Sequence, residues 1–439
     1  MSRAERSGPR SLLLGTGIVA LEFATAVTRF VASTLLPAIA PDLHARDQLA
    51  FLVASTSLGL FVALPLASRT LDLLGPRRTL GVGLTGYLGG LIIAATAGDA
   101  WVFALGQFTS GIAGGVLAIF GISAAIEHLD DSVRAKVVAV SASMWILPAL
   151  VGPVATLGLE HLIGWRWTLL VPVPAVLVGR ILLVRAIGDQ PRSATTDRPL
   201  GRTLLIPLGA AAIIFGSDLW FLVAAGLLVA LIGVNAVMPP GTLSLHRGSQ
   251  AALTAMMLFG AGYFGADSLI TILLTDTYRM SLGQAAIVLS AAPIAWGLTS
   301  LISSQFARPT AGRAFPVTGL ALAACAMLAL VVTALTEPGM VAALAAWAAV
   351  GTGVGLAYPA LYVTASTPRG SSLGPSELAV AVITAEAFGG LIGQSVGGVI
   401  SSYDGGVPIA YVLFGCCLAA AAVSAVRAQR PGDGLPRPS

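Results

Sequence analysis

Long apolar blocks alternate with short polar turns along nearly the whole chain. A helix rises about 1.5 Å per residue, so roughly 20 apolar residues are needed to cross the hydrocarbon core of a bilayer. The ten-residue alternation typical of a transmembrane β-barrel is absent, so the pattern predicts an all-α, polytopic membrane protein. The predicted spans are 11–38, 49–69, 79–98, 101–127, 135–159, 167–187, 250–275, 284–304, 314–335, 340–366, 376–400 and 406–427.

The predicted helices form two sets of six, at 11–187 and 250–427, of nearly equal length. Glycine-rich stretches recur about 240 residues apart, so we interpret the chain as a duplicated six-helix unit. The recurring glycines are Gly111, Gly114 and Gly115 against Gly351, Gly353 and Gly355, and Gly152 against Gly393.

A central segment, 188–249, joins the two sets and carries two further apolar runs. We expect these runs, at 203–216 and 219–238, to form an extra transmembrane hairpin, 203–238, which brings the total to fourteen spans. The first run has only about 14 residues, so an interfacial or re-entrant helix pair is the alternative.

Composition and charge agree with a membrane protein and set its orientation. The chain is 56% hydrophobic and 10% charged, against about 45–50% and 25% in soluble domains. With the tails 1–10 and 428–439 inside, nearly all basic residues face the cytoplasm, and only Arg46, Arg166 and Arg279 lie outside. We therefore expect a multi-pass protein of the inner (plasma) membrane with both termini cytoplasmic. The net charge of +4 reports this topology and not a nucleic-acid partner.

The fifth span and its exit carry a motif that resembles one transporter family. It reads Pro148-Ala-Leu-Val-Gly152-Pro153-Val-Ala-Thr-Leu-Gly158 and then Gly164-Trp165-Arg166-Trp167. This resembles the Gly-Pro antiporter motif and the following Trp-Arg-Trp of the major facilitator superfamily, specifically its drug/proton antiporter branch. The resemblance covers about residues 11–427, and the fourteen predicted spans point to the 14-helix type of that branch. It implies two pseudo-symmetric six-helix bundles and proton-coupled export.

The loop between the second and third spans, 68–78, is similar to the superfamily's Gly-x-x-x-Asp-Arg-x-Gly-Arg-Arg signature. The matching residues are Asp72, Gly75 and Arg77. The departures are Ser68, Leu73 and Pro76. We expect Asp72, with Arg77 and Arg78, to latch the outward-open state at a cytoplasmic helix end. A purely topological role for the two arginines is the alternative.

Small residues repeat on one face of the fifth and eleventh spans. They are Gly152, Gly158, Gly389, Gly393 and Gly397. Glycine lets neighbouring helices approach closely, so we expect these faces to pack tightly and to rock during transport. Static packing alone is the alternative.

Few ionisable residues lie inside the predicted spans, where each costs roughly 2.5–3.5 kcal/mol even on a lenient insertion scale. Glu22 and Arg29 are seven residues apart on the first span and share one helix face. Asp267 and Glu386 lie in the seventh and eleventh core spans. A carboxylate that alternately meets water and an arginine can load and release a proton near neutral pH, so Glu22, Asp267 and Glu386 are the proton-coupling candidates. A fixed ion pair or a merely solvated carboxylate is the alternative for each.

We expect a substrate cavity at the midplane between the two halves. Its predicted lining is Glu22, Arg29, Gln107, Trp145, Tyr263, Asp267, Tyr358 and Glu386. Gln107 stands four residues before Gly111, where these antiporters usually carry an arginine, so an arginine-dependent proton relay is not carried over to this position. Alternatively, Arg29 binds an anionic substrate.

The leading hypothesis is an alternating-access exporter of small, amphipathic or drug-like molecules, driven by protons. A dedicated exporter of a lipid or secondary metabolite and an importer are the alternatives within transport. A membrane-embedded enzyme or receptor would need a nucleophile, a metal cluster or a sizeable soluble domain, and no such motif is present. Cys325, Cys416 and Cys417 lack metal or disulfide spacing. We expect no cofactor, metal or nucleic acid, and a monomer whose partners are substrate, protons and lipid.

Overall fold

The structure, a computed structural model, describes residues 9–128, 146–186, 200–216, 219–243, 247–305, 314–336, 339–366 and 375–429. In these ranges the chain is helical, with short turns and no strand, and the predicted all-α class is confirmed. The elements are α1 (Pro9–Asp42), the 3₁₀ turn η1 (Arg46–Gln48), α2 (Leu49–Ala95), α3 (Ala100–His128), α5 (Ile146–Thr168), α6 (Val173–Ala186), α7 (Leu200–Phe215), α8 (Trp220–Val237), α9 (Ser249–Ile272), the π-helical turn η2 (Leu273–Thr277), α10 (Leu282–Gln305), α11 (Phe315–Thr336), α12 (Met340–Ser366), α13 (Pro375–Ser401) and α14 (Gly406–Ala428).

Fewer helices qualify as membrane spans in the described part of the chain than the fourteen that the sequence predicts. Within the described ranges, ten helices are long and apolar enough to cross a bilayer, or up to eleven if the bent pair α5 and α6 makes one span. The helix α7 is apolar but is among the shorter ones, and part of the predicted span 135–159 lies outside the described residues. The predicted count of fourteen is therefore not confirmed.

The second and third predicted spans are continuous in α2, which bends at Gly75. This glycine has φ 72° and ψ 170°, a backbone conformation that is essentially restricted to glycine. The loop signature thus places its glycine at the one point where the chain must turn between two helical stretches. Arg77 and Arg78 follow the bend and are exposed.

The boundary between the fifth and sixth spans differs from the prediction. α5 continues to Thr168, past a bend at Gly164 (φ 78°, ψ 162°), and α6 begins only at Val173. The two helices meet at an angle of 61°. Pro172 lacks a backbone N–H and therefore suits the start of α6, whereas it would break a helix that began at residue 167.

The chain divides into two compact units. The first comprises Met1–Ala45 and Ser55–Pro207, and the second comprises Arg46–Ala54 and Leu208–Ser439. The division falls inside α7, and η1 with the first residues of α2 belongs to the second unit. The domain boundaries expected from the sequence stay a prediction.

The first unit is built around apolar side chains from α1, α2, α3 and α6. Its buried cluster comprises Leu14, Ala24, Leu80, Leu84, Tyr87, Leu91, Ala113, Leu117, Val176 and Leu183. At the crossing of α2 and α3 the two backbones are in direct contact, because glycines there have no side chain to separate them. A Cβ on Gly111 would collide with the Thr56 carbonyl, and a Cβ on Gly59 would collide with the Phe108 carbonyl.

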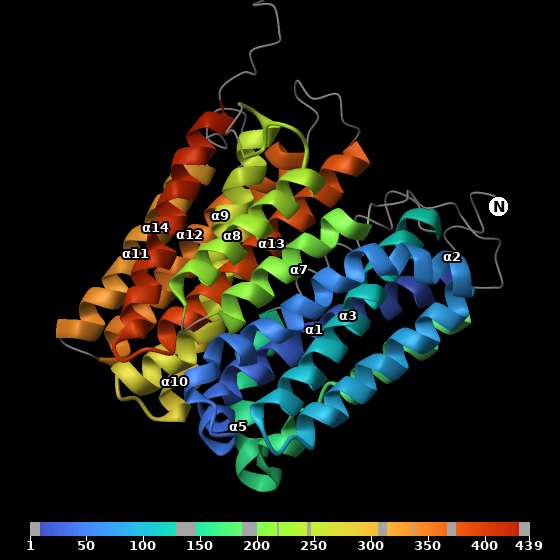
Figure 1. Cartoon of the computed structure of the whole chain (residues 1–439), viewed down its shortest axis with the longest axis horizontal. Helices are drawn as coiled ribbons and strands as arrows, with labels where there is room; N and C mark the ends of the chain where they lie inside the picture. Colours follow the sequence, from blue (N-terminus) through green and yellow to red (C-terminus); the bar gives the residue numbers. More distant parts are fainter. Residues whose placement is uncertain are drawn as a thin grey trace, which may run out of the picture. The chain divides into compact units, whose positions relative to one another are not determined.

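The second unit is organised around α9, which is buried along most of its length. α9 packs against α13 and α14, and α11 lies beside both α12 and α14 (Figure 1). Buried hydrogen bonds join these helices: the Tyr411 hydroxyl donates to the Ala266 carbonyl at 2.6 Å, and Ser424 donates to the Ala251 carbonyl at 2.8 Å. Such bonds satisfy polar side chains that have no water to bind within a membrane span.

The helices α7 and α8 pack closely where two glycines face each other. A Cβ on Gly209 would come within 2.5 Å of the Gly226 carbonyl oxygen, and one on Gly226 within 2.6 Å of the Gly209 carbonyl oxygen. The rest of α8 is largely exposed and apolar, with Trp220, Leu228 and Ile232 all more than half exposed. An apolar face of this kind suits contact with lipid.

The bend at Gly75 yields a stability prediction. We expect Gly75→Ala to lower the free energy of unfolding by about 1–3 kcal/mol, because a Cβ is strained at this φ and ψ. Gly89→Ala is the matched control, because Gly89 lies within helical α2 with no described heavy atom within 4 Å of its missing Cβ. The thermal midpoints of both purified variants in detergent check this, and equal midpoints would contradict it.

Candidate functional site

The structure places the two predicted carboxylates of the second unit in neighbouring helices. Asp267 is on α9 and is buried, with 8% of its surface exposed, and Glu386 is on α13 and is half-buried. Tyr263 precedes Asp267 by one helical turn, and Tyr358 is on α12. The second unit therefore contains four of the predicted site residues.

The structure joins two of these residues directly. The Tyr358 hydroxyl donates a hydrogen bond of 2.9 Å to Oε2 of Glu386. Because the acceptor is a carboxylate, this is the stronger, charge-assisted kind of hydrogen bond. It fixes one oxygen of Glu386 against the ring of Tyr358.

Aromatic rings from three helices gather around this pair. We call the following residues the aromatic cluster: Phe259, Tyr263, Phe264, Trp296, Trp347, Tyr358 and Tyr362. The Tyr358 ring lies 5.2 Å from Trp296 and 5.7 Å from Phe259 between centroids. Most ring pairs in the aromatic cluster are edge-to-face or tilted, the arrangements that the ring quadrupole favours.

The aromatic cluster has a buried base and a half-buried margin. Phe259, Tyr263 and Trp347 are at most 2% exposed, and the Trp347 indole donates to the Leu289 carbonyl at 3.3 Å. The four other rings and Glu386 are half-buried. The buried rings thus support the half-buried rings, one of which, Tyr358, holds the carboxylate.

Glycines bring α13 against α9 beside Glu386. A Cβ on Gly260 would collide with the Glu386 carbonyl, and one on Gly389 would collide with the Met257 carbonyl. Gly393 lies against Ala261 in the same way. The tight packing predicted for this face is therefore present on α13.

The fifth span does not show the same closeness. A Cβ on Gly152 would be 3.5 Å from Phe30, an ordinary contact, and among described residues none lies within 4 Å of a Cβ on Gly158. Among the described residues, the two glycine faces that look alike in sequence are thus packed differently.

Asp267 lies in a separate polar environment of α9. It is within electrostatic range of Tyr411, whose hydroxyl donates to the carbonyl of the adjacent Ala266. Tyr411 is fully buried. A buried carboxylate therefore lies beside a buried tyrosine within a largely apolar helix.

The predicted residues of the first unit are only partly described. Glu22, Arg29 and Asp72 lie on α1 and α2, but their side chains are outside the described part, as is the side chain of Pro153, and Trp145 lies outside it altogether. Gln107 is 4% exposed, and it accepts a 3.3 Å hydrogen bond from Thr56 at the α2–α3 crossing. Gln107 thus links α2 and α3 of the first unit through this hydrogen bond.

Sequence reasoning assigned no contacts to the Trp-Arg-Trp motif, and the structure supplies them. Arg166 forms an ion pair of 2.9 Å with Asp42 at the end of α1 and donates to the Ala97 carbonyl at 3.1 Å. The Trp165 indole donates to the same Asp42 oxygen at 3.1 Å. The guanidinium of Arg166 lies 4.3 Å from the Trp165 ring centroid. The motif thus ties α5 to the end of α1 and to the α2–α3 turn.

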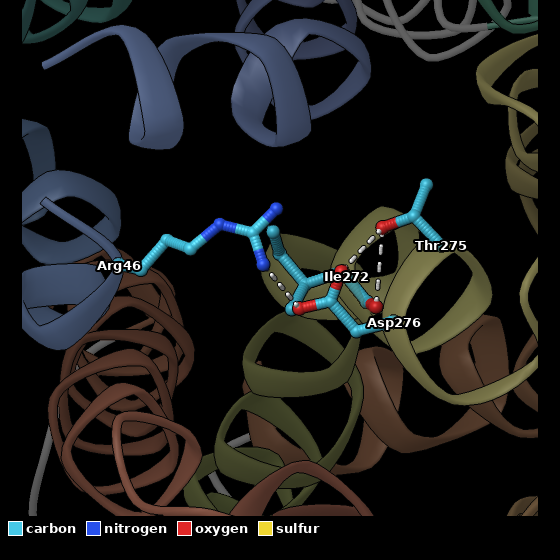
Figure 2. Close-up of polar contacts among 4 residues, drawn as sticks. All are labelled: Arg46, Ile272, Thr275 and Asp276. Carbon is cyan, nitrogen blue, oxygen red and sulfur yellow. Dashed lines mark hydrogen bonds and ion pairs between the residues drawn. The ribbon is translucent and has the colours of Figure 1, made fainter. Parts of the chain in front are cut away.

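A second ion pair, which was not predicted from the sequence, joins η1 and η2. Arg46 of η1 lies 3.8 Å from Asp276 of η2, and Thr275 donates to the other oxygen of Asp276 at 3.2 Å (Figure 2). Both partners are substantially exposed, at 67% and 41%. Ion pairs this exposed contribute little stability.

Comparisons with known proteins agree on one family. The family model described as the Major Facilitator Superfamily matches residues 18–374. The chain is 27% identical to a probable multidrug-efflux transporter of Mycobacterium tuberculosis, over 97% of both chains. It is 21% identical to the multidrug transporter protein MdtP of Bacillus subtilis, over 91% of this chain and 75% of that one. The solved D-xylose–proton symporter has the same fold, with a TM-score of 0.68, 15% identity and coverage of 97% and 98%.

The Asp42–Arg166 ion pair allows a test of the motif's structural role. We expect a double-mutant cycle of Asp42→Ala and Arg166→Ala to give a coupling of about 0.5–1 kcal/mol, since both side chains are partly exposed and water weakens the attraction. Thermal unfolding of the single and double variants measures this coupling. Arg185→Ala, which removes an exposed arginine at the end of α6, is the control and should show no coupling to Asp42→Ala. Strictly additive effects at positions 42 and 166 would argue against the pair.

Proposed function

The chain belongs to the major facilitator superfamily, and from this premise we propose that it is a proton-coupled antiporter that exports small, amphipathic or drug-like molecules by alternating access. One relative is named as a probable multidrug-efflux transporter and another as a multidrug transporter, which supports export and a small-molecule substrate. Membership of a transporter family also supports a protein that is not an enzyme. We place it in the inner (plasma) membrane with both termini in the cytoplasm, following its basic residues.

The observation that carries proton coupling is the burial of Asp267 in α9. Only 8% of this residue is exposed, within a helix that qualifies as a membrane span. A carboxylate at such a depth costs roughly 2.5–3.5 kcal/mol, so its presence calls for a function. Protonation removes that cost, and a residue that is protonated in one state and ionised in another carries a proton across.

We propose that Glu22 on α1 is the second carrier and that Asp72 latches one conformational state. Glu22 shares a helix face with Arg29, since α1 is helical across both residues. The bend at Gly75 supports the latch, because it places Asp72 close to the start of the following helical stretch, where a carboxylate is stabilised.

We also propose that α7 and α8 cross the membrane as a hairpin, so that fourteen segments cross in all. The glycine contact between the two helices supports a hairpin, and the apolar exposed face of α8 supports contact with lipid. At 16 residues, α7 is short and would need local thinning of the bilayer.

The transport test uses purified protein in proteoliposomes with an imposed pH gradient. We expect Asp267→Asn and Glu22→Gln each to abolish accumulation of a transported dye, because the amide cannot carry a proton. Exchange of dye between equally loaded sides should continue, since the amide resembles the protonated carboxylate in shape. A panel of cationic, neutral and anionic dyes with a lipid probe separates a multidrug pump from a dedicated lipid exporter.

The control for this test is Asp404→Asn, which removes an exposed carboxylate between α13 and α14 and should leave accumulation intact. An Asp267→Asn variant that still accumulates dye against its gradient, driven by the pH difference alone, would remove Asp267 from the proton path. Loss of both accumulation and exchange, together with a lower thermal midpoint, would instead show a structural ion pair.

The hairpin is tested by cysteine labelling in a variant that lacks the three native cysteines. We expect Ser217→Cys, between the two helices, to react with a membrane-impermeant maleimide in intact cells, because a crossing hairpin puts its tip outside. Ser193→Cys, in the central segment before α7, should react only after the cells are permeabilised. Protection of both positions in intact cells would show a helix pair that lies on the cytoplasmic surface.

A further inference from the structure

One arginine of the first unit lies inside an apolar helix. Arg180 belongs to the apolar segment Val173–Leu183, and the helix α6 continues past it to Ala186, about 9 Å further along the axis. Its side chain is half-buried. Within the described part of the chain, no hydrogen bond or ion pair involves Arg180. A charge at this depth of a membrane span is costly, so it calls for a partner.

The guanidinium of Arg180 lies where α6 meets the second helical stretch of α2, Arg77–Ala95. Its Nη2 atom is 3.8 Å from the point where a Cβ on Gly81 would stand, and no other described heavy atom of a neighbouring element lies within 4 Å of that point. Leu80 of α2 and Leu183 of α6 belong to the same buried cluster. Below their exposed surface the two helices thus share a core, and Gly81 leaves space beside the guanidinium.

Three more arginines lie near the ends of these two helical stretches. Arg77 and Arg78 begin the stretch that follows the bend at Gly75, and Arg185 is in the last turn of α6; all three are exposed. Neither Arg77–Ala95 nor α6 contains an aspartate or a glutamate. In the proposed orientation both ends face the cytoplasm. The two helices therefore carry four positive charges toward one side of the membrane.

Apolar side chains are exposed on the same two helices. On α2 they include Val82 and Ile92, and on α6 they include Val178 and Ile181, each about half exposed. Exposed apolar side chains on a membrane span face lipid chains. The arginines thus stand where the acyl chains of a lipid end and its head group begins.

This combination favours an anionic phospholipid over other anions. A planar guanidinium forms paired hydrogen bonds with phosphate oxygens, and basic pockets between membrane helices on the cytoplasmic side suit anionic head groups. A soluble anion would match the charge but would leave the apolar faces of the two helices unused. The amine of a zwitterionic lipid would meet repulsion from the arginines.

We propose that Arg180, with Arg77, Arg78 and Arg185, binds the head group of an anionic phospholipid of the cytoplasmic leaflet where α2 meets α6. The leaflet rests on the proposed orientation, whereas the binding itself does not depend on proton-coupled export. The phosphate supplies the partner that the charge of Arg180 calls for, and the acyl chains lie along the exposed apolar side chains of both helices.

The test is native mass spectrometry of the purified full-length protein in detergent, titrated with phosphatidylglycerol or with phosphatidylcholine of identical acyl chains. We expect the wild type to bind phosphatidylglycerol at least about fivefold more tightly. Arg180→Gln should lower this affinity about fivefold, the effect of one basic residue near an anionic head group. Its affinity for phosphatidylcholine should change by less than about twofold, because no net charge is lost from that contact. Arg180→Lys should keep part of the preference, since it keeps the charge without the planar fork.

A second variant keeps the test decisive if Arg180→Gln fails to fold. Gly81→Leu keeps every arginine but fills the space beside the guanidinium, so it should also weaken binding of phosphatidylglycerol. Gly89→Leu is its matched control on the same helix, since no described heavy atom lies within 4 Å of a Cβ there. Arg427→Gln is the charge control: it removes an exposed arginine in the last turn of α14 and should leave the preference unchanged.

Four outcomes would overturn the proposal. They are a wild type without preference for phosphatidylglycerol, a folded Arg180→Gln variant that binds it unchanged, an equal loss in Arg427→Gln, and displacement of the lipid by equimolar inorganic phosphate, which would show a site for a soluble anion. Because no gradient is present, an absence of proton-driven transport would leave the lipid result standing. Conversely, loss of the lipid preference would leave the proposed export untouched.

Discussion

The close approach of helix backbones at glycine is the contact on which both units of this protein depend. In a membrane the hydrophobic effect gives little reason for one apolar helix to prefer another helix over lipid, so association relies on packing and hydrogen bonds. Gly111 lets α3 reach the backbone of α2 at Thr56, and Gly351 lets α12 reach α10 at Ala292. These two glycines are one of the pairs that recur between the halves of the sequence. The repeat thus encodes the same kind of helix crossing in each unit.

Where helices approach this closely, polar groups from different helices come within hydrogen-bond distance. At the α2–α3 crossing the result is the bond between Thr56 and Gln107. Next to the α12–α10 crossing, Ser300 and Ser303 donate to the Gly355 carbonyl. At the α9–α13 crossing the backbone of Glu386 is held against Gly260. The helix packing and the placement of the candidate site therefore have the same physical origin.

Much of the fold follows from the one-dimensional pattern, whereas the site follows only in part. Apolar blocks predicted nearly every described helix, because the length of a helix in lipid is set by bilayer thickness. The predicted start of α6, residue 167, was wrong. The apolar pattern continues through the bend, and only Pro172 marks the boundary. Glu386 and Tyr358 were each singled out as rare polar groups, but their hydrogen bond depends on how α12 and α13 cross. Trp296 and Phe264 gave no signal, because an aromatic residue in an apolar span reads equally well as a lipid contact. The partnership of Trp165 with Asp42 spans 123 residues of sequence and has no local trace.

The assignment of Arg46–Ala54 to the second unit has a consequence for biogenesis. This short segment is synthesised early, between α1 and most of α2, yet it completes a unit whose other residues begin at Leu208. Its contacts there include Arg46 with Asp276 and Ala50 against Gly398. The second unit therefore cannot acquire all of its packing from its own continuous stretch of chain. During insertion, the segment Arg46–Ala54 can form its contact with Gly398 only after α13 has been synthesised. If the chain were cut between the units, the second unit would be complete only with the segment that the N-terminal fragment carries.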